Sequence, residues 1–182
     1  VKIIDPESGE TLPLNAKGEY CTRGYHVMKE YFEMPEATAK TIDEEGWLHT
    51  GDLCSMDKRG YCTVVGRLKD LIIRGGENIY PREIEELLFR HPSVGDAAVV
   101  GLPSERMGEE VGVFLRPAPN EVIDKDVLFA YVREHLSPQK TPRFWYLVDE
   151  YPLTGSGKIQ KFVLRQQWQE GRYQEMDFAQ DG

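Results

Sequence analysis

The sequence predicts an α+β protein in which a small β-rich subdomain precedes a compact α+β domain with a short central sheet and flanking helices. Up to about residue 67, short strand-like runs alternate with turn clusters. Beyond that point, helices with clear apolar faces are interspersed with strand-sized apolar runs. We therefore divide the chain into residues 1–68, residues 69–170 and a polar tail over residues 171–182.

Composition excludes several classes of protein. The 182 residues are 40% hydrophobic and 29% charged, the balance of a soluble globular protein, and no apolar run is long enough for a transmembrane segment. The 31 acidic and 22 basic side chains give a net charge of -9, which disfavours nucleic acid as a partner. Three cysteines without zinc-like spacing suit reduced thiols and a cytoplasmic location.

In the first part, residues 1–5 form the first expected strand and residues 36–41 the one expected helix. Residues 53–56 and 61–65 flank a turn in which Gly60 can adopt a positive φ, so they predict a hairpin. The chain opens on a strand without an initiator methionine, which suggests a piece of a longer protein.

The second part begins with a short strand at 71–73, followed by a glycine pair and a helix. Pro81 suits the first helical position, and Ile84, Leu87 and Leu88 fall on one face at helical spacing. The remaining expected elements are strands at 97–100, 111–115 and 144–148, and helices at 126–136 and 162–169.

The loop at 152–158 (PLTGSGK) presents Lys158 among glycines and hydroxyl side chains. Such a loop lets an ammonium group approach phosphate or carboxylate oxygens closely. Its spacing differs from that of the Walker loop, because only two residues separate Gly155 from Lys158. The alternative is a surface turn with a solvated lysine.

Three further segments could contact a ligand. In 47–52 (WLHTGD), the Asp52 carboxylate could accept both hydrogen bonds of a ribose cis-diol, or it could only cap its own turn. In 66–70 (GRLKD), Arg67 could add a contact to a diol or phosphate, or it could belong to a solvated linker. In 74–81 (RGGENIYP), the glycine pair allows close approach of a ligand but would also serve as a turn.

Taken in order, these segments resemble the adenylate-forming superfamily of acyl-CoA synthetases, luciferases and peptide-synthetase adenylation domains. Gly18-Glu19 and Arg23-Gly24 add to the resemblance, which extends from Val1 to about Trp168. Segments 74–81 and 106–110 (RMGEE) are most similar to fatty or medium-chain acyl-CoA ligases.

The resemblance implies a two-step reaction. A carboxylic (fatty) acid and ATP would give an acyl-adenylate and pyrophosphate, and coenzyme A would then displace AMP. The family's phosphate-binding loop and its Mg²⁺-binding acid have no counterpart in this sequence, so we expect them upstream of Val1. The 182 residues alone are therefore expected to be inactive.

The resemblance also assigns roles to residues. Asp52 and Arg67 would bind the nucleotide, Lys69 would be the hinge before a mobile C-terminal domain, and Lys158 would act in adenylation. Acylation of Lys158 would erase its charge. The remaining residues would line the channel through which the CoA thiol enters: Gly75, Gly76, Glu77 and Asn78.

The same residues also fit three other functions. A non-catalytic module of the same fold could bind a nucleotide, CoA or a partner protein. A peptide-synthetase adenylation domain is less favoured, because no carrier motif follows Trp168. A luciferase-type oxygenase shares the same motifs. The sequence predicts no protein metal site, acyl chain length or oligomeric state.

Overall fold

A computed structural model describes residues 1–178 and divides the chain into two compact units, Val1–Lys69 and Asp70–Gly182, called unit 1 and unit 2 below. Each is described by itself. No helix within the described range is both long enough and apolar enough to cross a membrane.

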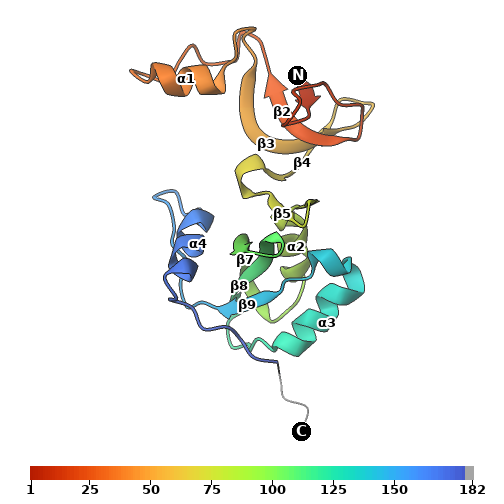
Figure 1. Cartoon of the computed structure of the whole chain (residues 1–182), viewed down its shortest axis with the longest axis vertical. Coiled ribbons are helices and arrows are strands. Elements are labelled where there is room, and N and C mark those ends of the chain that lie inside the picture. Colours follow the sequence, from red (N-terminus) through yellow and green to blue (C-terminus); the bar gives the residue numbers. More distant parts are fainter. Residues whose placement is uncertain (179–182) are drawn as a thin grey trace. The chain divides into compact units, whose positions relative to one another are not determined.

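Unit 1 is built on an antiparallel sheet in which every strand pairs with its neighbour in the chain (Figure 1). Its strands are β1 (Lys2–Ile4), β2 (Lys17–Thr22), β3 (Leu48–Met56) and β4 (Cys62–Arg67). Its small core contains Ile3, Ile4, Cys21, Leu53 and Cys54. Helix α1 (Pro35–Thr41) has no buried residue.

The hairpin predicted around Gly60 is present as β3 and β4, and Gly60 has a φ of +85°. A left-handed residue of this kind is accessible to glycine without the steric cost that a Cβ would add. After β4, the short 3-10 helix η1 (Leu68–Asp70) spans the division between the units.

Unit 2 contains a mixed sheet whose central strand is β8 (Gly108–Pro117). Strand β7 (Val94–Ser104) pairs antiparallel with β8 along its length. The other edge of β8 pairs with β5 (Ile72–Arg74) at Gly108 and, in parallel, with β9 (Phe144–Leu147) at residues 112–115. Strand β6 (Glu77–Ile79) completes the sheet beside β5.

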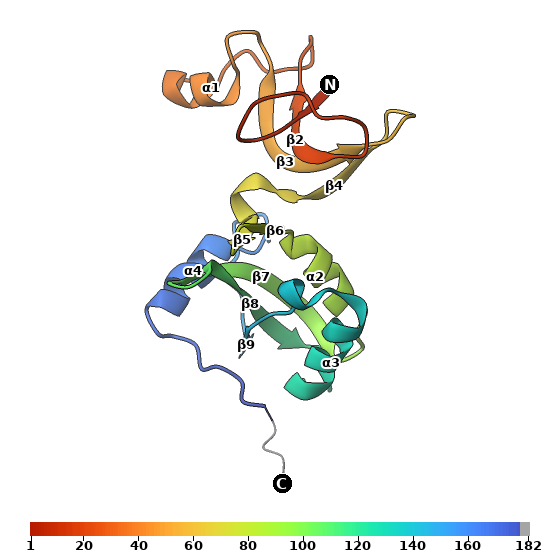
Figure 2. The same ribbon diagram turned by 45° about the vertical axis from the view of Figure 1, so that its right-hand side comes forward.

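Helices cover both faces of this sheet (Figure 2). Val99, Val111 and Val113 point to one face, where α2 (Pro81–Leu88) and α3 (Lys125–His135) pack through Leu88 and Leu128. On the opposite face, the core consists of Ala98, Val100, Leu102, Phe114, Tyr146, Val148 and Leu164, the last from α4 (Lys161–Gln169). The alternation of side chains along β7 and β8 therefore supplies two cores.

The segment after α4 also contacts unit 2. Tyr173 packs against Phe114 with ring centroids 4.9 Å apart, and Glu175 forms an antiparallel bridge with Tyr146. The Met176 carbonyl accepts a hydrogen bond from the ammonium of Lys125, a buried lysine. Through these contacts, residues 173–176 run back across the sheet of unit 2.

The predicted α+β class is confirmed. The expected helices are present within one or two residues of their predicted bounds, while β3, β7 and β8 are longer than expected. Strands β2 and β6 were not predicted; β2 begins within a cluster of turn-forming residues, and β6 directly follows the glycine pair. The parallel pairing of β9 with β8 was not predictable either, because the local sequence pattern does not encode which strands pair.

Candidate functional site

Asp52 and Arg67 form an ion pair across two neighbouring strands of unit 1. They are directly opposite in the β3–β4 register, and Arg67 Nε donates to Asp52 Oδ1 at 2.8 Å. The side chains of Asp52 and Arg67 are 37% and 53% exposed. Since a carboxylate has about four acceptor positions, Asp52 can bind Arg67 and still accept hydroxyl donors from solvent.

The backbone immediately before Asp52 makes a fixed turn. Gly51 has a φ of +69°, a conformation that suits glycine. Thr50 Oγ1 donates to the Tyr20 carbonyl at 2.7 Å and accepts from the Asp52 amide at 3.1 Å. The Gly51 amide donates to Glu19 Oε1 at 3.0 Å. Two consecutive residues of β2 therefore hold this turn.

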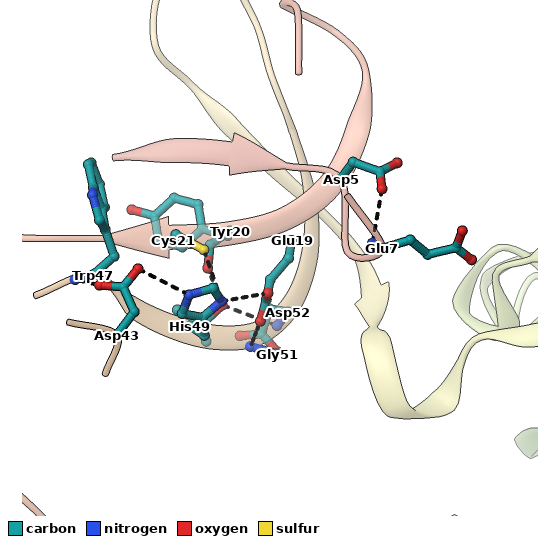
Figure 3. Close-up of polar contacts among 11 residues, drawn as sticks. Asp5, Glu7, Glu19, Tyr20, Cys21, Asp43, Trp47, His49, Gly51 and Asp52 are labelled. Carbon is teal, nitrogen blue, oxygen red and sulfur yellow. Dashed lines mark hydrogen bonds and ion pairs between the residues drawn. The ribbon is translucent and has the colours of Figure 1, made fainter. Parts of the chain in front are cut away.

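Glu19 also belongs to a polar cluster next to the turn (Figure 3). Its Oε2 accepts from His49 Nδ1 at 2.9 Å, and His49 Nε2 lies 3.6 Å from Asp43 Oδ2. Cys21 Sγ lies 3.6 Å from the same Nδ1. Burial raises the pKa of the Cys21 thiol to about 11, so the thiol is protonated near neutral pH.

Asp43 is held by the loop that leads into β3. Its Oδ1 accepts from the amides of Glu45 and Trp47 at 3.0 and 2.8 Å. Burial alone would raise the pKa of the Asp43 carboxyl, but these amides and His49 together lower it. The carboxylate therefore stays ionised and can orient the His49 ring.

Lys69 lies in η1 and is the last residue of unit 1. Its side chain is exposed. A short polar segment of this kind can change backbone angles without uncovering a core.

The glycine pair of unit 2 is a two-residue hairpin loop. Arg74 and Glu77 are cross-strand partners, and Gly75 and Gly76 between them have φ values of +58° and +86°. Positive φ at both positions is the geometry of a type I′ turn. A Cβ on Gly75 would lie 2.6 Å from Met107 Cε, whereas a Cβ on Gly76 would meet nothing within 4 Å. Gly76 therefore faces open space, and the adjacent Glu77 and Asn78 are also exposed.

Arg74 ties this hairpin to the centre of unit 2. Its Nε donates to Glu110 Oε2 at 2.5 Å and its Nη1 to the Gln139 carbonyl at 3.0 Å. The Glu110 side chain is only 8% exposed. The hairpin is thus anchored at its base while Gly76 stays free.

Lys158 lies in a small closed hairpin. Leu153 and Ile159 form an antiparallel bridge, and the Thr154 amide donates to the Lys158 carbonyl at 2.8 Å. Thr154 Oγ1 accepts from the Lys158 amide at 3.0 Å, and Gly157 has a φ of +79°. The Lys158 side chain is exposed, and no acidic group within residues 1–178 forms an ion pair with it. Its charge is therefore available to an anion.

Both ends of this hairpin are attached to the body of unit 2. Before it, the hydroxyl of the half-buried Tyr151 donates to the Phe114 carbonyl at 2.8 Å, and burial raises the Tyr151 pKa. After it, Lys161 Nζ pairs with Glu85 at 2.6 Å and Arg165 with Glu109 at 2.8 Å. The lysine loop thus projects from a fixed base.

Of the predicted site residues, the structure brings together Asp52 and Arg67. Within the described residues, no hydrogen bond or ion pair joins the Lys158 hairpin to the Gly75–Gly76 turn. Glu19, His49 and Tyr151 also support the site, although the sequence predicted no role for them. A glutamate and a histidine in strand-forming sequence were the available signals.

Comparison with known proteins finds a family model that matches part of unit 2. The model described as "AMP-binding enzyme C-terminal domain" matches residues 83–158, a range that ends at Lys158. Solved structures that resemble this chain over 90% or more of its length are adenylate-forming enzymes.

Two solved members of the superfamily illustrate the match. ATP-bound MatB from Rhodopseudomonas palustris is 36% identical, with a TM-score of 0.86 over 93% of this chain and 34% of MatB. MenE from Bacillus subtilis, in complex with the acyl-adenylate intermediate OSB-AMP, is 34% identical with a TM-score of 0.83. The MenE match covers 90% of this chain and 33% of MenE.

Acyl-CoA synthetases are also found among its sequence relatives. YngI of Bacillus subtilis (strain 168), named as an acyl-CoA synthetase, is 49% identical over 91% of this chain. Rattus norvegicus ACSF2, a mitochondrial medium-chain acyl-CoA ligase, is 46% identical over 93%. The chain spans 30% of YngI and 28% of ACSF2, so it corresponds to less than a third of these superfamily members.

Proposed function

We propose that this chain supplies the nucleotide-binding turn and the mobile lysine domain of an AMP-forming acid–thiol ligase. The protein would join a carboxylic acid to ATP, giving an acyl-adenylate and pyrophosphate, and would then transfer the acyl group to the thiol of coenzyme A with release of AMP. The names of YngI and ACSF2 support acyl-CoA formation, and that of ACSF2 supports a fatty acid of medium length as substrate.

The observation that carries this proposal is the Lys158 hairpin. A cation with no acidic partner among residues 1–178 projects from a loop closed by Thr154, within the matched C-terminal domain. An ammonium placed so can stabilise the negative charge that builds on the α-phosphate oxygens and the leaving pyrophosphate while a carboxylate attacks the phosphorus. Lys158 is therefore assigned to the adenylation step.

Asp52 and Arg67 are assigned to the nucleotide. The Asp52 carboxylate would accept hydrogen bonds from the ribose hydroxyls, while Arg67 holds the carboxylate in place and adds a positive charge. The half-exposed position of both side chains leaves room for a ligand.

The hinge and channel residues are assigned to the second step. Rotation about Lys69 would withdraw the Lys158 hairpin and present another face of the C-terminal domain, so that one pocket serves both reactions. Gly75, Gly76, Glu77 and Asn78 would then line the path of the CoA thiol, where the open space around Gly76 admits a narrow chain.

The residues described here do not form an evident magnesium site. Among residues 1–178, one group of three candidate ligands lies close together, Glu19, Cys21 and His49, and it includes a thiol. Mg²⁺ prefers oxygen ligands, so this group does not fit it. We place the protein in the cytoplasm on its free thiols, although ACSF2 carries a mitochondrial label.

The decisive experiment separates the two half-reactions in the product of the complete reading frame. Lys158→Ala should slow pyrophosphate release by on the order of 10²-fold or more, because it removes a charge directed at the transition state. The same variant should still transfer the acyl group from a pre-made acyl-adenylate to CoA. Lys58→Ala, at an exposed lysine in the β3–β4 turn, is the control. Equal losses in both half-reactions would contradict the assignment.

A further inference from the structure

Glu19 is a buried acid in a strand that the reaction scheme leaves without a role. It lies on β2, opposite Leu53 of β3, and is 7% exposed. A buried carboxylate is costly unless its oxygens are hydrogen-bonded. Both oxygens of Glu19 have donors, and both donors come from β3.

The two donors lie just before Asp52 in the chain. Glu19 Oε1 accepts from the Gly51 amide at 3.0 Å, and Oε2 accepts from His49 Nδ1 at 2.9 Å (Figure 3). Because a carboxylate only accepts, His49 carries a hydrogen on Nδ1. One side chain therefore fixes the backbone at residue 51 and the ring at residue 49.

The conformation of Gly51 depends on the hydrogen bonds made by its neighbours. Its positive φ is an uncommon conformation that the surroundings must hold. Thr50 Oγ1 bonds the Tyr20 carbonyl and the Asp52 amide, but within residues 1–178 only Glu19 accepts from the Gly51 amide itself. The direction in which the chain leaves Gly51 sets where the Asp52 carboxylate points.

A metal ion is the other chemistry that these residues suggest. Ligand atoms of Glu19, Cys21 and His49 lie within 4.8 Å of one another. However, the Glu19 oxygens and His49 Nδ1 already satisfy each other and the Gly51 amide, and a metal would have to displace the Glu19–His49 bond. The arrangement is a completed hydrogen-bond network.

We propose that Glu19 is a positioning residue for nucleotide recognition: its hydrogen bond to the Gly51 amide aims the Asp52 carboxylate at the ribose hydroxyls. The inference rests on the proposed role of Asp52 and extends it to a residue on another strand. Glu19 touches no substrate in this scheme and acts through Asp52.

Deoxynucleotides test this proposal in the product of the complete reading frame. Adenylation is measured with ATP, 2′-deoxy-ATP and 3′-deoxy-ATP, and the ratio of kcat/KM values gives the ribose discrimination. A charge-assisted hydrogen bond predicts discrimination on the order of 10-fold or more for the unmodified protein. Glu19→Ala should reduce it to about 2-fold or less, because a misdirected Asp52 no longer senses the missing hydroxyl.

A purely structural role would give a different result. General destabilisation would lower kcat/KM for all three nucleotides by the same factor and leave the ratio unchanged, which would overturn the proposal. Glu19→Gln retains an oxygen for the Gly51 amide and should keep most of the discrimination. A Gln variant as poor as Ala would also overturn the proposal, since charge and not the Gly51 bond would then be responsible. Glu10→Ala, at an exposed acid of unit 1, is the matched control.

Two further variants keep the outcome decisive. If Glu19→Ala does not fold by circular dichroism, Glu19→Asp takes its place. Its carboxylate is one methylene short of Gly51, so it should lose at least 3-fold in discrimination, and full retention would overturn the proposal. Asp52→Ala separates this inference from the proposed function. If Asp52→Ala keeps full discrimination, the ribose role itself fails. If Asp52→Ala loses discrimination while Glu19→Ala keeps it, the role of Glu19 fails and that of Asp52 stands.

Discussion

Arg67 Nε donates to Asp52 Oδ1 from the position directly opposite on the neighbouring strand, so the register of one hairpin places a cation beside the carboxylate proposed to bind ribose. The pair lies largely in solvent, where ion pairs contribute at most about 1 kcal/mol to stability. We therefore expect the pair to contribute mainly to nucleotide binding.

Replacing Arg67 by alanine should raise the KM for ATP by roughly 10-fold, because hydrogen bonds to charged groups contribute about 1.5–3 kcal/mol. The melting temperature should change little. Pyrophosphate release at varied ATP, together with a thermal melt, measures both quantities. A lower melting temperature with an unchanged KM would mean that the pair is only structural.

Replacing Gly76 by leucine should impair transfer of the acyl group to CoA and spare adenylation, because the side chain would fill the proposed thiol path. The positive φ at Gly76 adds backbone strain of about 1–2 kcal/mol. Gly60 offers a matched control, since its φ is +85° and a Cβ there also meets nothing within 4 Å. Gly60→Leu carries the same strain in unit 1 and should leave both half-reactions intact. Loss of adenylation alone in Gly76→Leu would refute the channel assignment.

Replacing Glu110 by alanine should destabilise unit 2 by about 2–3 kcal/mol, because it leaves the mostly buried Arg74 guanidinium without its carboxylate. Arg74 keeps its hydrogen bond to the Gln139 carbonyl, so the loss of stability should lie near the lower end of the range for broken buried ion pairs. Urea unfolding followed by tryptophan fluorescence reports it, since Trp145 is buried in this unit. The exposed Arg82–Glu86 pair is the control, and Glu86→Ala should cost less than about 0.5 kcal/mol.

The three thiols should differ sharply in reactivity. Cys62 is exposed, whereas Cys21 and Cys54 are buried and burial raises the pKa of each to about 11. Because the thiolate is the reactive species, iodoacetamide at pH 8 should label Cys62 first. Mass spectrometry of peptides gives the site of labelling. Rapid labelling of Cys21 or Cys54 in the folded protein would contradict this expectation.

The same pKa shifts predict how stability depends on alkaline pH. Folding favours the protonated thiols of Cys21 and Cys54, so their contribution is complete below the unfolded pKa near 9 and is lost as pH rises through about 11. The free energy of unfolding should fall across this interval. Cys21→Ala and Cys54→Ala together should flatten the fall, as urea titrations at pH 8, 9, 10 and 11 would show.

The hairpin that contains Asp52 and Arg67 illustrates what the sequence could and could not predict. Its turn was predictable from Gly60 and the flanking apolar runs. The pairing was not, because a register shift between Leu53 and Cys54 places Arg67 opposite Asp52, where regular pairing would place Gly66. A bulge depends on packing around the whole sheet, and the local pattern carries no sign of it.

Unit 2 shows the same limit for longer-range contacts. The apolar face of α2 was predictable from the spacing of Ile84, Leu87 and Leu88, all of which are buried. The turn chemistry of the glycine pair was visible, but the attachment of that turn through Arg74 to Glu110 joins residues 36 positions apart. Side-chain pairs of this kind follow from the fold and cannot be inferred from periodicity.

The bond between Lys125 and the Met176 carbonyl joins positions 51 residues apart, and its acceptor lies in the segment that recrosses the sheet. During synthesis, Lys125 emerges long before its acceptor, and its ammonium must stay hydrated until residues 173–178 have left the ribosome. Helix α3 can therefore dock fully only after residues 173–178 have been synthesised. Unit 2 should mature in one late step, as its last strand bridge closes between Tyr146 and Glu175.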